Sequence, residues 1–150
     1  MKAIQASLVN TPILIIEDDP EQNELLTMML ANHQFPVMGC LTGQAALAAC
    51  QEQKFEVVIL DLSLPDMDGL DMLKHLKQHN AQIKVIIFTG HPSTESAISA
   101  VNQDVFAYIK KPEGSAVLLN QIDRACLIHY NETLEEKLKV QNDWTLNISD

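Results

Sequence analysis

The sequence is poor in several features that would define particular classes of protein. It has three cysteines in 150 residues, at positions 40, 50 and 126, and this odd number at wide spacing predicts neither a disulfide framework nor a zinc site. No apolar run approaches the ~20 residues that a membrane helix needs. Polar residues interrupt the uncharged stretch between Ala3 and Ile16, so we predict neither a signal peptide nor a membrane anchor. These absences predict a cytoplasmic protein with no membrane contact.

Basic residues are also scarce. Lysine and arginine together number 10 against 20 aspartates and glutamates, which gives a formal net charge of −10. Such a surface repels phosphate backbones and anionic lipids, so we expect no direct binding of this chain to nucleic acid. The hydrophobic content of 47% is typical of a globular chain, and the length suits one domain with a short appendage.

Short apolar runs rich in isoleucine and valine alternate with longer segments of helical spacing. The runs are Ile13–Ile16, Val37–Cys40, Val57–Leu60, Val85–Phe88 and Val105–Ile109. Four of them are nearly continuous, which is typical of parallel strands buried on both faces. Five such strand–helix units predict an α/β fold with a doubly wound, five-stranded parallel sheet and right-handed crossovers.

The expected helices begin at recognisable residues, namely Pro20, Thr42, Gly69, either Ser93 or Thr94, and Gly114. In the first helix we expect Leu25, Leu26, Met29 and Leu30 to share one apolar face. The last helix meets no glycine or proline after Gly114 and should overrun the domain. We therefore predict an N-terminal extension over 1–11, a domain over 12–127 and a helical extension or linker over 128–150.

Polar side chains follow the predicted strands at the points where they end. Glu17 and Asp18 follow the first strand, Asp61 the third and Thr89 the fourth, and the fifth leads to Lys111. In a doubly wound sheet the functional crevice lies beyond the carboxyl ends of the strands, so these groups should meet at one edge.

The chemistry of that cluster is specific. Two carboxylates ~4 Å apart repel by about 4 kcal/mol at an effective dielectric constant of 20, so a group of acids needs a cation or raised pKa values. An open, carboxylate-rich site favours Mg²⁺, which also binds phosphate. A carboxylate beside Mg²⁺, a lysine and a threonine is equipped for phosphoryl transfer.

Four segments, ILIIEDDP, VVILDLSLPDMDGL, VIIFTG and AYIKKP, occur in this order and resemble the receiver domains of response regulators, the CheY-like domains of two-component signalling. The resemblance implies a flavodoxin-like sheet of order 2-1-3-4-5. It makes Asp61 the phosphoacceptor, and Asp18, Asp61 and the Ser63 carbonyl Mg²⁺ ligands, with Glu17 acting through water. It also makes Lys111, and not Lys110, the lysine of the site.

The same resemblance implies a signalling domain that catalyses only its own phosphorylation and dephosphorylation. The phosphoryl group would come from a sensor histidine kinase or a phosphotransfer protein. Thr89 and Tyr108 look like the switch pair, and the fourth helix, fifth strand and fifth helix would form the responsive face. The resemblance also suggests a cis bond before Pro112. The sequence departs from the usual pattern at Glu17, Asp104 and Glu113.

Other functions and sites fit the sequence less well. A receiver-shaped interaction module that takes no phosphate would not need the complete set of acids, threonine and lysine. A metal-dependent phosphatase would need a substrate-binding insertion, and the haloacid dehalogenase pattern has a second Asp where Ser63 stands. The segment from Pro65 to Gly69 fails the EF-hand spacing. His75 and His79 have zinc-compatible spacing without an evident third ligand. For the extension, we expect a homodimer contact or a connection to a downstream output domain.

Overall fold

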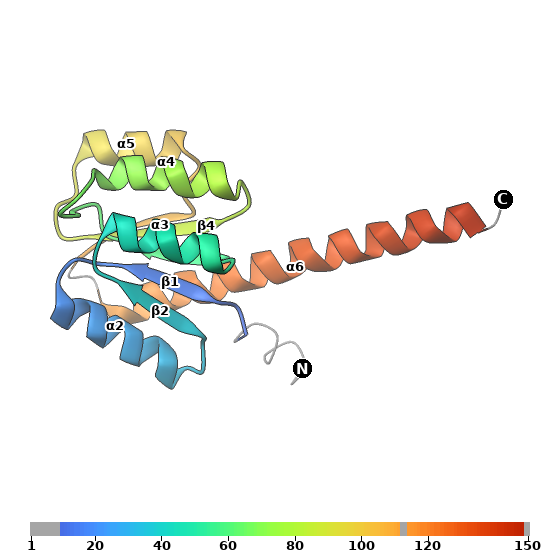
Figure 1. Ribbon diagram of the computed structural model, residues 1–150, viewed down its shortest axis with the longest axis horizontal. Coiled ribbons are helices and arrows are strands. Elements are labelled where there is room, and N and C mark those ends of the chain that lie inside the picture. The colour runs from blue at the N-terminus through green and yellow to red at the C-terminus, as the bar shows by residue number, and fades with distance from the viewer. Residues whose placement is uncertain (1–9, 112–113, 149–150) are drawn as a thin grey trace.

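The computed structural model describes residues 10–111 and 114–148. Five parallel strands form one sheet in the order β2-β1-β3-β4-β5, so the predicted fold class and strand order are confirmed (Figure 1). The strands are β1 (Ile13–Ile16), β2 (Val37–Cys40), β3 (Val57–Leu60), β4 (Lys84–Thr89) and β5 (Ala107–Lys110). The first three have the predicted bounds, and the differences at β4 and β5 are one or two residues at an end.

Helices cover both faces of the sheet (Figure 1). On one face lie α2 (Pro20–Asn32) and α6 (Ser115–Ile148), and on the other lie α3 (Gly43–Glu52), α4 (Gly69–His79) and α5 (Thr94–Asn102). Side-chain oxygens of Asp19, Thr42, Asp68 and Ser93 accept backbone N–H bonds in the first turns of α2 to α5. These caps satisfy donors that a helix start leaves unpaired, which explains why the helices begin where the sequence indicated.

Two hydrophobic cores lie against the sheet. One joins alternate residues of β1, β3 and β4 to α3 and α4, and the other joins the remaining residues to α2 and α6. All four residues of β1 and of β3 are buried, as expected for strands at the centre of a parallel sheet. Strand β2 lies at the edge, and its Met38 and Gly39 are exposed. The rigid centre of the sheet therefore carries the ends of β1 and β3.

Helix α2 packs on the sheet through three of the four apolar residues that were expected to share a face, and Leu25 is the exception. Leu25 is 66% exposed, so its assignment to the apolar face is wrong, whereas Asn23 and Leu30 are buried. The Asn23 side-chain amide donates to the carbonyls of Glu17 and Cys40, both at 3.0 Å. These two bonds turn Asn23 toward the sheet, and Leu25, two residues and about 200° further around the helix, faces outward.

Helix α6 packs against the sheet over its first half, and its second half projects beyond the sheet (Figure 1). Leu118, Ile122, Ala125 and Cys126 are buried against the sheet. Lys84 Nζ lies 3.0 Å from the Glu132 carboxylate, and His129 Nδ1 lies 3.4 Å from Glu56 Oε2. The helix beyond Glu132 thus leaves the domain from a fixed anchor.

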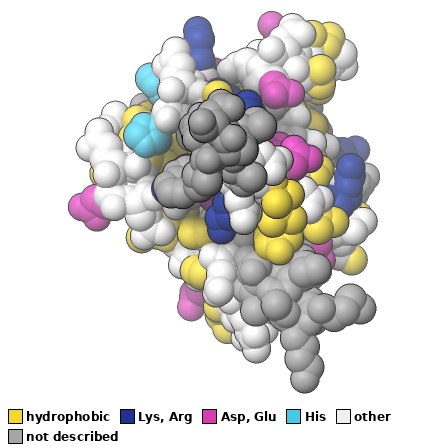
Figure 2. All heavy atoms as spheres, turned by 90° about the vertical axis from the view of Figure 1, so that its right-hand side faces the viewer, with side chains coloured by type: hydrophobic (Ala, Val, Ile, Leu, Met, Phe, Trp, Pro, Cys, Tyr) yellow, Lys and Arg dark blue, Asp and Glu magenta, His cyan; other side chains and the backbone are white. Residues whose placement is uncertain are grey.

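Figure 2 shows the side from which α6 projects, with acidic and basic side chains scattered among uncharged ones in the part the structure describes. Within 10–111 and 114–148, none of the helices combines the length and the apolar character that crossing a membrane requires.

Candidate phosphoacceptor site

The sheet register places the candidate acids side by side. Ile16 at the end of β1 pairs with Leu60 at the end of β3, so Glu17 and Asp61 follow at the same level. The Asp61 N–H donates to the Ile16 carbonyl at 2.9 Å, and the Glu17 N–H to the Cys40 carbonyl at 3.1 Å. Backbone bonds from the neighbouring strands therefore fix both residues at the carboxyl edge of the sheet.

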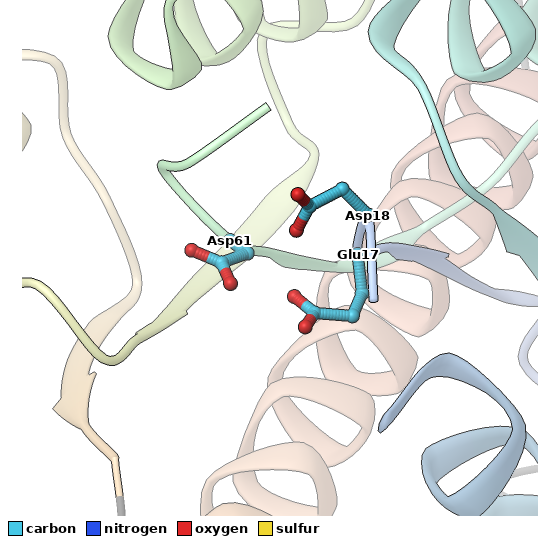
Figure 3. A group of neighbouring side chains, drawn as sticks. All are labelled: Glu17, Asp18 and Asp61. Atoms are coloured by element: carbon cyan, nitrogen blue, oxygen red, sulfur yellow. The ribbon is translucent and has the colours of Figure 1, made fainter. Parts of the chain in front are cut away.

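Three carboxylates converge at this edge. Figure 3 shows Glu17 and Asp18 extending from the end of β1 toward Asp61. Each offers one oxygen that lies within 4.8 Å of the others, and this is the one such group of acids, histidines or cysteines within residues 10–111 and 114–148. Glu17 and Asp61 are buried, whereas Asp18 is exposed. An oxygen-only donor set with an exposed member is the kind that a hard, partly hydrated cation such as Mg²⁺ prefers.

Lys111 brings a positive charge into the same cluster. Its Nζ lies 2.9 Å from Asp61 Oδ2 and 3.1 Å from Glu17 Oε1, and it also donates to Gln22 Oε1 at 2.6 Å. The ammonium lies 5.4 Å from the centroid of the Phe88 ring. Lys110 is exposed, and strand alternation directs it away from the site.

Asp61 is held by both of its oxygens. Oδ1 accepts the Ser63 N–H at 3.0 Å while Oδ2 accepts from Lys111. Because two carboxylate oxygens have four lone pairs in all, Asp61 can accept further bonds beside these two. The loop that follows is closed by a bond from the Gly69 N–H to the Leu62 carbonyl at 3.2 Å. A Cβ on Gly69 would meet the Leu62 backbone at 2.4 Å, so this close approach requires glycine.

The loop is also attached to the neighbouring helix. The two carboxylate oxygens of Asp66 accept the N–H groups of Gly43 and Gln44, both at 2.9 Å, across the start of α3. This anchor, together with the closure at Gly69, holds Ser63 in place beside Asp61.

The cluster shifts the acidity of its members in opposite directions. Burial, reinforced by the hydrogen bond and charge of Asp61, raises the pKa of Glu17 to about 8, although Lys111 acts in the other direction. Burial alone would raise the pKa of Asp61, but bonds from Glu17, Ser63 and Lys111 outweigh it and hold that pKa below the usual value. Burial works against the charge of Lys111, yet Asp61 and Glu17 raise its pKa. Near neutral pH and without a metal, Glu17 thus keeps its proton beside an ionised Asp61.

The two residues of the expected switch pair lie on neighbouring strands. Thr89 ends β4 and is fully buried, and its hydroxyl oxygen accepts the His91 N–H at 3.2 Å. Tyr108 lies in β5, with its hydroxyl 2.7 Å from Ser96 Oγ and 3.4 Å from the Ser93 nitrogen at the start of α5. The tyrosine hydroxyl is therefore bound to α5 in this structure.

Of the positions where the sequence departs from the usual receiver pattern, the structure describes Asp104 but not Glu113. Asp104 has φ of 58°, the left-handed conformation that aspartate tolerates better than most residues. The expected cis bond before Pro112 and the charge of Glu113 lie outside the described residues.

Gln22 and Asn23 are site features that the sequence analysis missed. Both stand in a polar run at the start of α2, so neither the contact of Gln22 nor the burial of Asn23 has a distinguishing signal in the sequence.

Comparisons with known proteins agree with this geometry. The model of the response regulator receiver domain matches residues 13–123. The transcriptional regulatory protein GlrR of Escherichia coli (strain K12) is 31% identical over 113 residues, or 75% of this chain and 26% of GlrR. A CheY-like receiver domain protein from Methanospirillum hungatei JF-1 superposes with a TM-score of 0.79 at 28% identity, covering 82% of this chain and 98% of that chain.

A third similar protein is the BeF3-activated DrrB receiver domain, with a TM-score of 0.71 at 27% identity over 77% of this chain and 97% of that chain. The chain belongs to the response regulator receiver domain family. It is thus the signalling module of a two-component system, and it spans about a quarter of the length of GlrR.

Proposed function

We propose that this domain takes a phosphoryl group on Asp61 from a sensor histidine kinase or a phosphotransfer protein. The observation that carries the proposal is the position of the Lys111 ammonium, 2.9 Å from Asp61 Oδ2, in a group of three carboxylates within 4.8 Å of one another. An ionised carboxylate is a nucleophile, and a cation fixed beside it is already in place to stabilise the negative charge that develops in the transition state.

In the proposed transfer, an Asp61 carboxylate oxygen attacks the phosphorus of a phosphohistidine. The new oxygen–phosphorus bond forms as the phosphorus–nitrogen bond breaks, and the donor imidazole keeps the electron pair. Lys111 stabilises the negative charge of the phosphoryl oxygens, and Thr89 donates a hydroxyl hydrogen bond to one of them. Self-catalysed dephosphorylation is a separate hydrolysis: water attacks the phosphorus, the bond between phosphorus and Asp61 breaks, Asp61 leaves as a carboxylate, and inorganic phosphate is released with the proton of the water passing to solvent.

The residues present suit Mg²⁺, which would neutralise charge on the transferring group. We propose Asp18, Asp61 and the Ser63 carbonyl as its ligands, with Glu17 acting through a water molecule. Asp61 fits this role because its two oxygens offer four lone pairs, and the bonds from Ser63, Lys111 and Glu17 leave one of them free. Asp18 fits because it is the exposed member, where a partly hydrated ion has access.

We propose that phosphorylation shifts an equilibrium between two forms of the face made by α5, β5 and α6. Tyr108 supports this because its hydroxyl links β5 to Ser96 of α5 at 2.7 Å. If Thr89 moves toward the phosphoryl group, Tyr108 can follow inward, and its bonds to α5 must then break. The start of α5 is thereby released or repositioned.

We also propose where the domain begins and ends. Residues 12–127 would form the receiver, 1–11 an extension, and 128–150 a linker or self-association helix. The anchors of α6 at His129 and Glu132 lie at the start of the proposed extension, so the part of it that projects freely would begin after Glu132. The downstream partner would be a second copy or an output domain, and direct nucleic-acid binding by this chain is not expected at a net charge of −10.

The experiment is incubation of the protein with Mg²⁺ and acetyl phosphate, followed by intact mass measurement. We expect the mass of one phosphoryl group, lost in base, in the wild type and in the control Asp71→Asn, whose carboxylate lies in the first turn of α4. Asp61→Asn should fold and gain nothing. A pure interaction module would gain no mass in any variant, and a phosphatase would turn over acetyl phosphate without retaining a stable share of it.

A further inference from the structure

Lys111 has a third acceptor that differs in kind from the two carboxylates. A lysine ammonium has three N–H donors, and here they meet Glu17 Oε1 at 3.1 Å, Asp61 Oδ2 at 2.9 Å and Gln22 Oε1 at 2.6 Å. The three oxygens come from the ends of β1 and β3 and from α2. The shortest of the three bonds goes to the neutral amide.

The two carboxylates are also the groups that a cation would need. Glu17 and Asp61 belong to the convergent cluster, whereas Gln22 does not. A divalent ion in that cluster repels the Lys111 ammonium and competes with it for the same oxygens. Among the hydrogen bonds that the structure gives the Lys111 ammonium in the described residues, the one to Gln22 is the one that this competition leaves untouched.

The amide of Gln22 is itself oriented for this contact. Its Nε2 donates to Asp19 Oδ2 at 3.4 Å, and its backbone N–H donates to Asp19 Oδ1 at 3.3 Å. Asp19 is the N-cap of α2, so the cap and the side chain of Gln22 are held together at the helix start. The amide nitrogen faces an anion and the amide oxygen faces a cation, which is the favourable arrangement for both.

We propose that Gln22 is a positioning residue for Lys111. It keeps the ammonium aimed at Asp61 when a cation and a phosphoryl group occupy the carboxylates. This role rests on the proposed function of Asp61, and it would make the start of α2 part of the reaction machinery. Gln22 itself takes no part in bond making.

The test is a double-mutant cycle with Gln22→Leu, Lys111→Met and the double variant, in the full chain. Calorimetry measures beryllofluoride binding in the presence of Mg²⁺. We expect Gln22→Leu to bind beryllofluoride roughly 3- to 10-fold more weakly, which is the net contribution of a typical intramolecular hydrogen bond. In the Lys111→Met background the same substitution should change the affinity by less than about twofold, because there is no ammonium left to position.

Two further variants separate positioning from general structure. Gln22→Glu keeps an acceptor oxygen and should bind beryllofluoride closer to the wild type than Gln22→Leu does. Gln51→Leu, an exposed glutamine of α3, should match the wild type. The unfolding midpoint of each variant is measured as well. A general loss of stability in Gln22→Leu would not make its effect on beryllofluoride binding depend on the presence of Lys111.

The outcomes distinguish this inference from the function on which it rests. If Gln22→Leu weakens binding equally with and without Lys111, or not at all, Gln22 does not position Lys111 and the function of Asp61 stands. If the wild type binds no beryllofluoride with Mg²⁺ present, the phosphoacceptor function fails and the role of Gln22 fails with it.

Discussion

The Lys111 ammonium lies 2.9 Å from Asp61 Oδ2, although 50 residues separate the two in the chain. The sheet produces this contact, because β3, which precedes Asp61, pairs with β4, and β4 pairs with β5, which precedes Lys111. The Lys111 N–H also donates to the Thr89 carbonyl at 2.8 Å. These backbone bonds fix the position of Lys111 independently of its side-chain contacts.

That contact predicts different effects for two adjacent lysines. Lys111→Ala should reduce phosphorylation by acetyl phosphate and beryllofluoride binding by at least about tenfold, because the buried Asp61 loses a charged hydrogen-bond donor. Lys110→Ala should leave both within about twofold of the wild type, since Lys110 is exposed. Rate measurements on the two variants decide the matter. A defect confined to Lys110→Ala would mean that Lys110, and not Lys111, is the lysine of the site.

Substitution of Asp18 should weaken metal binding, whereas substitution of its neighbour Asp19 should lower the stability of the fold. Asp18→Asn should weaken Mg²⁺ binding more than Glu17→Gln or Asp19→Asn does, while the unfolding free energy changes little. Asp19→Ala should instead lower the unfolding free energy by about 0.5–2 kcal/mol, because Asp19 caps α2, and should largely retain Mg²⁺ binding. Metal titration and urea unfolding of each variant provide the two readouts. Equal loss of Mg²⁺ affinity in all of them would contradict the ligand role of Asp18.

The raised pKa of Glu17 predicts a pH dependence of stability without metal. Its pKa rises from 4.5 to about 8 on folding, so between these values the folded state keeps a proton that the unfolded state has lost. The unfolding free energy should therefore fall as pH rises from about 5 to 8, by up to about 1.4 kcal/mol per pH unit from this group.

Glu17→Gln is the matched variant, because it removes the titration and keeps the shape of the side chain. Urea unfolding in the presence of a chelator, at several pH values, should give this variant a flatter profile than the wild type between pH 5 and 8. Profiles of equal slope would place the raised pKa on another group.

The projecting part of α6 carries an exposed apolar stripe, with Leu134 43% and Leu138 52% exposed. We expect it to associate with a second copy or to continue into a downstream segment, since such a narrow stripe is typical of a short coiled coil. A chain ending after Thr133 keeps the anchors at His129 and Glu132 and removes the stripe. Light scattering with and without beryllofluoride should show dimers only for the full chain. Monomers throughout would leave the linker as the role of this helix.

The fold and the acidic edge were predictable because they depend on patterns that buried strands impose. Continuous apolar runs such as Val57–Leu60 predict central strands, and parallel topology then brings the residues after them to one edge. Asp61 and Lys111 could be paired for that reason alone. Receiver membership came from the resemblance of the motifs, and the family comparison confirms it.

Features that depend on side-chain orientation were not predictable in the same way. The outward position of Leu25 results from two hydrogen bonds made by Asn23, and apolar spacing alone cannot register them. The contact of Gln22 with Lys111 depends on the angle at which α2 leaves β1. His129 lies 3.4 Å from Glu56 because α6 crosses the start of β3, and this crossing is set by tertiary packing.

The residue that carries the phosphoryl group can be identified chemically, and this identification decides whether Asp61 is the phosphoacceptor. After phosphorylation with acetyl phosphate and Mg²⁺, borohydride reduces an aspartyl phosphate to homoserine, which peptide mass spectrometry locates in the sequence. We expect homoserine at position 61, and none there in Asp61→Asn or in samples without Mg²⁺. Homoserine at position 18 or 66 instead, or none in a sample that has gained the phosphoryl mass, would contradict the claim that Asp61 is the phosphoacceptor.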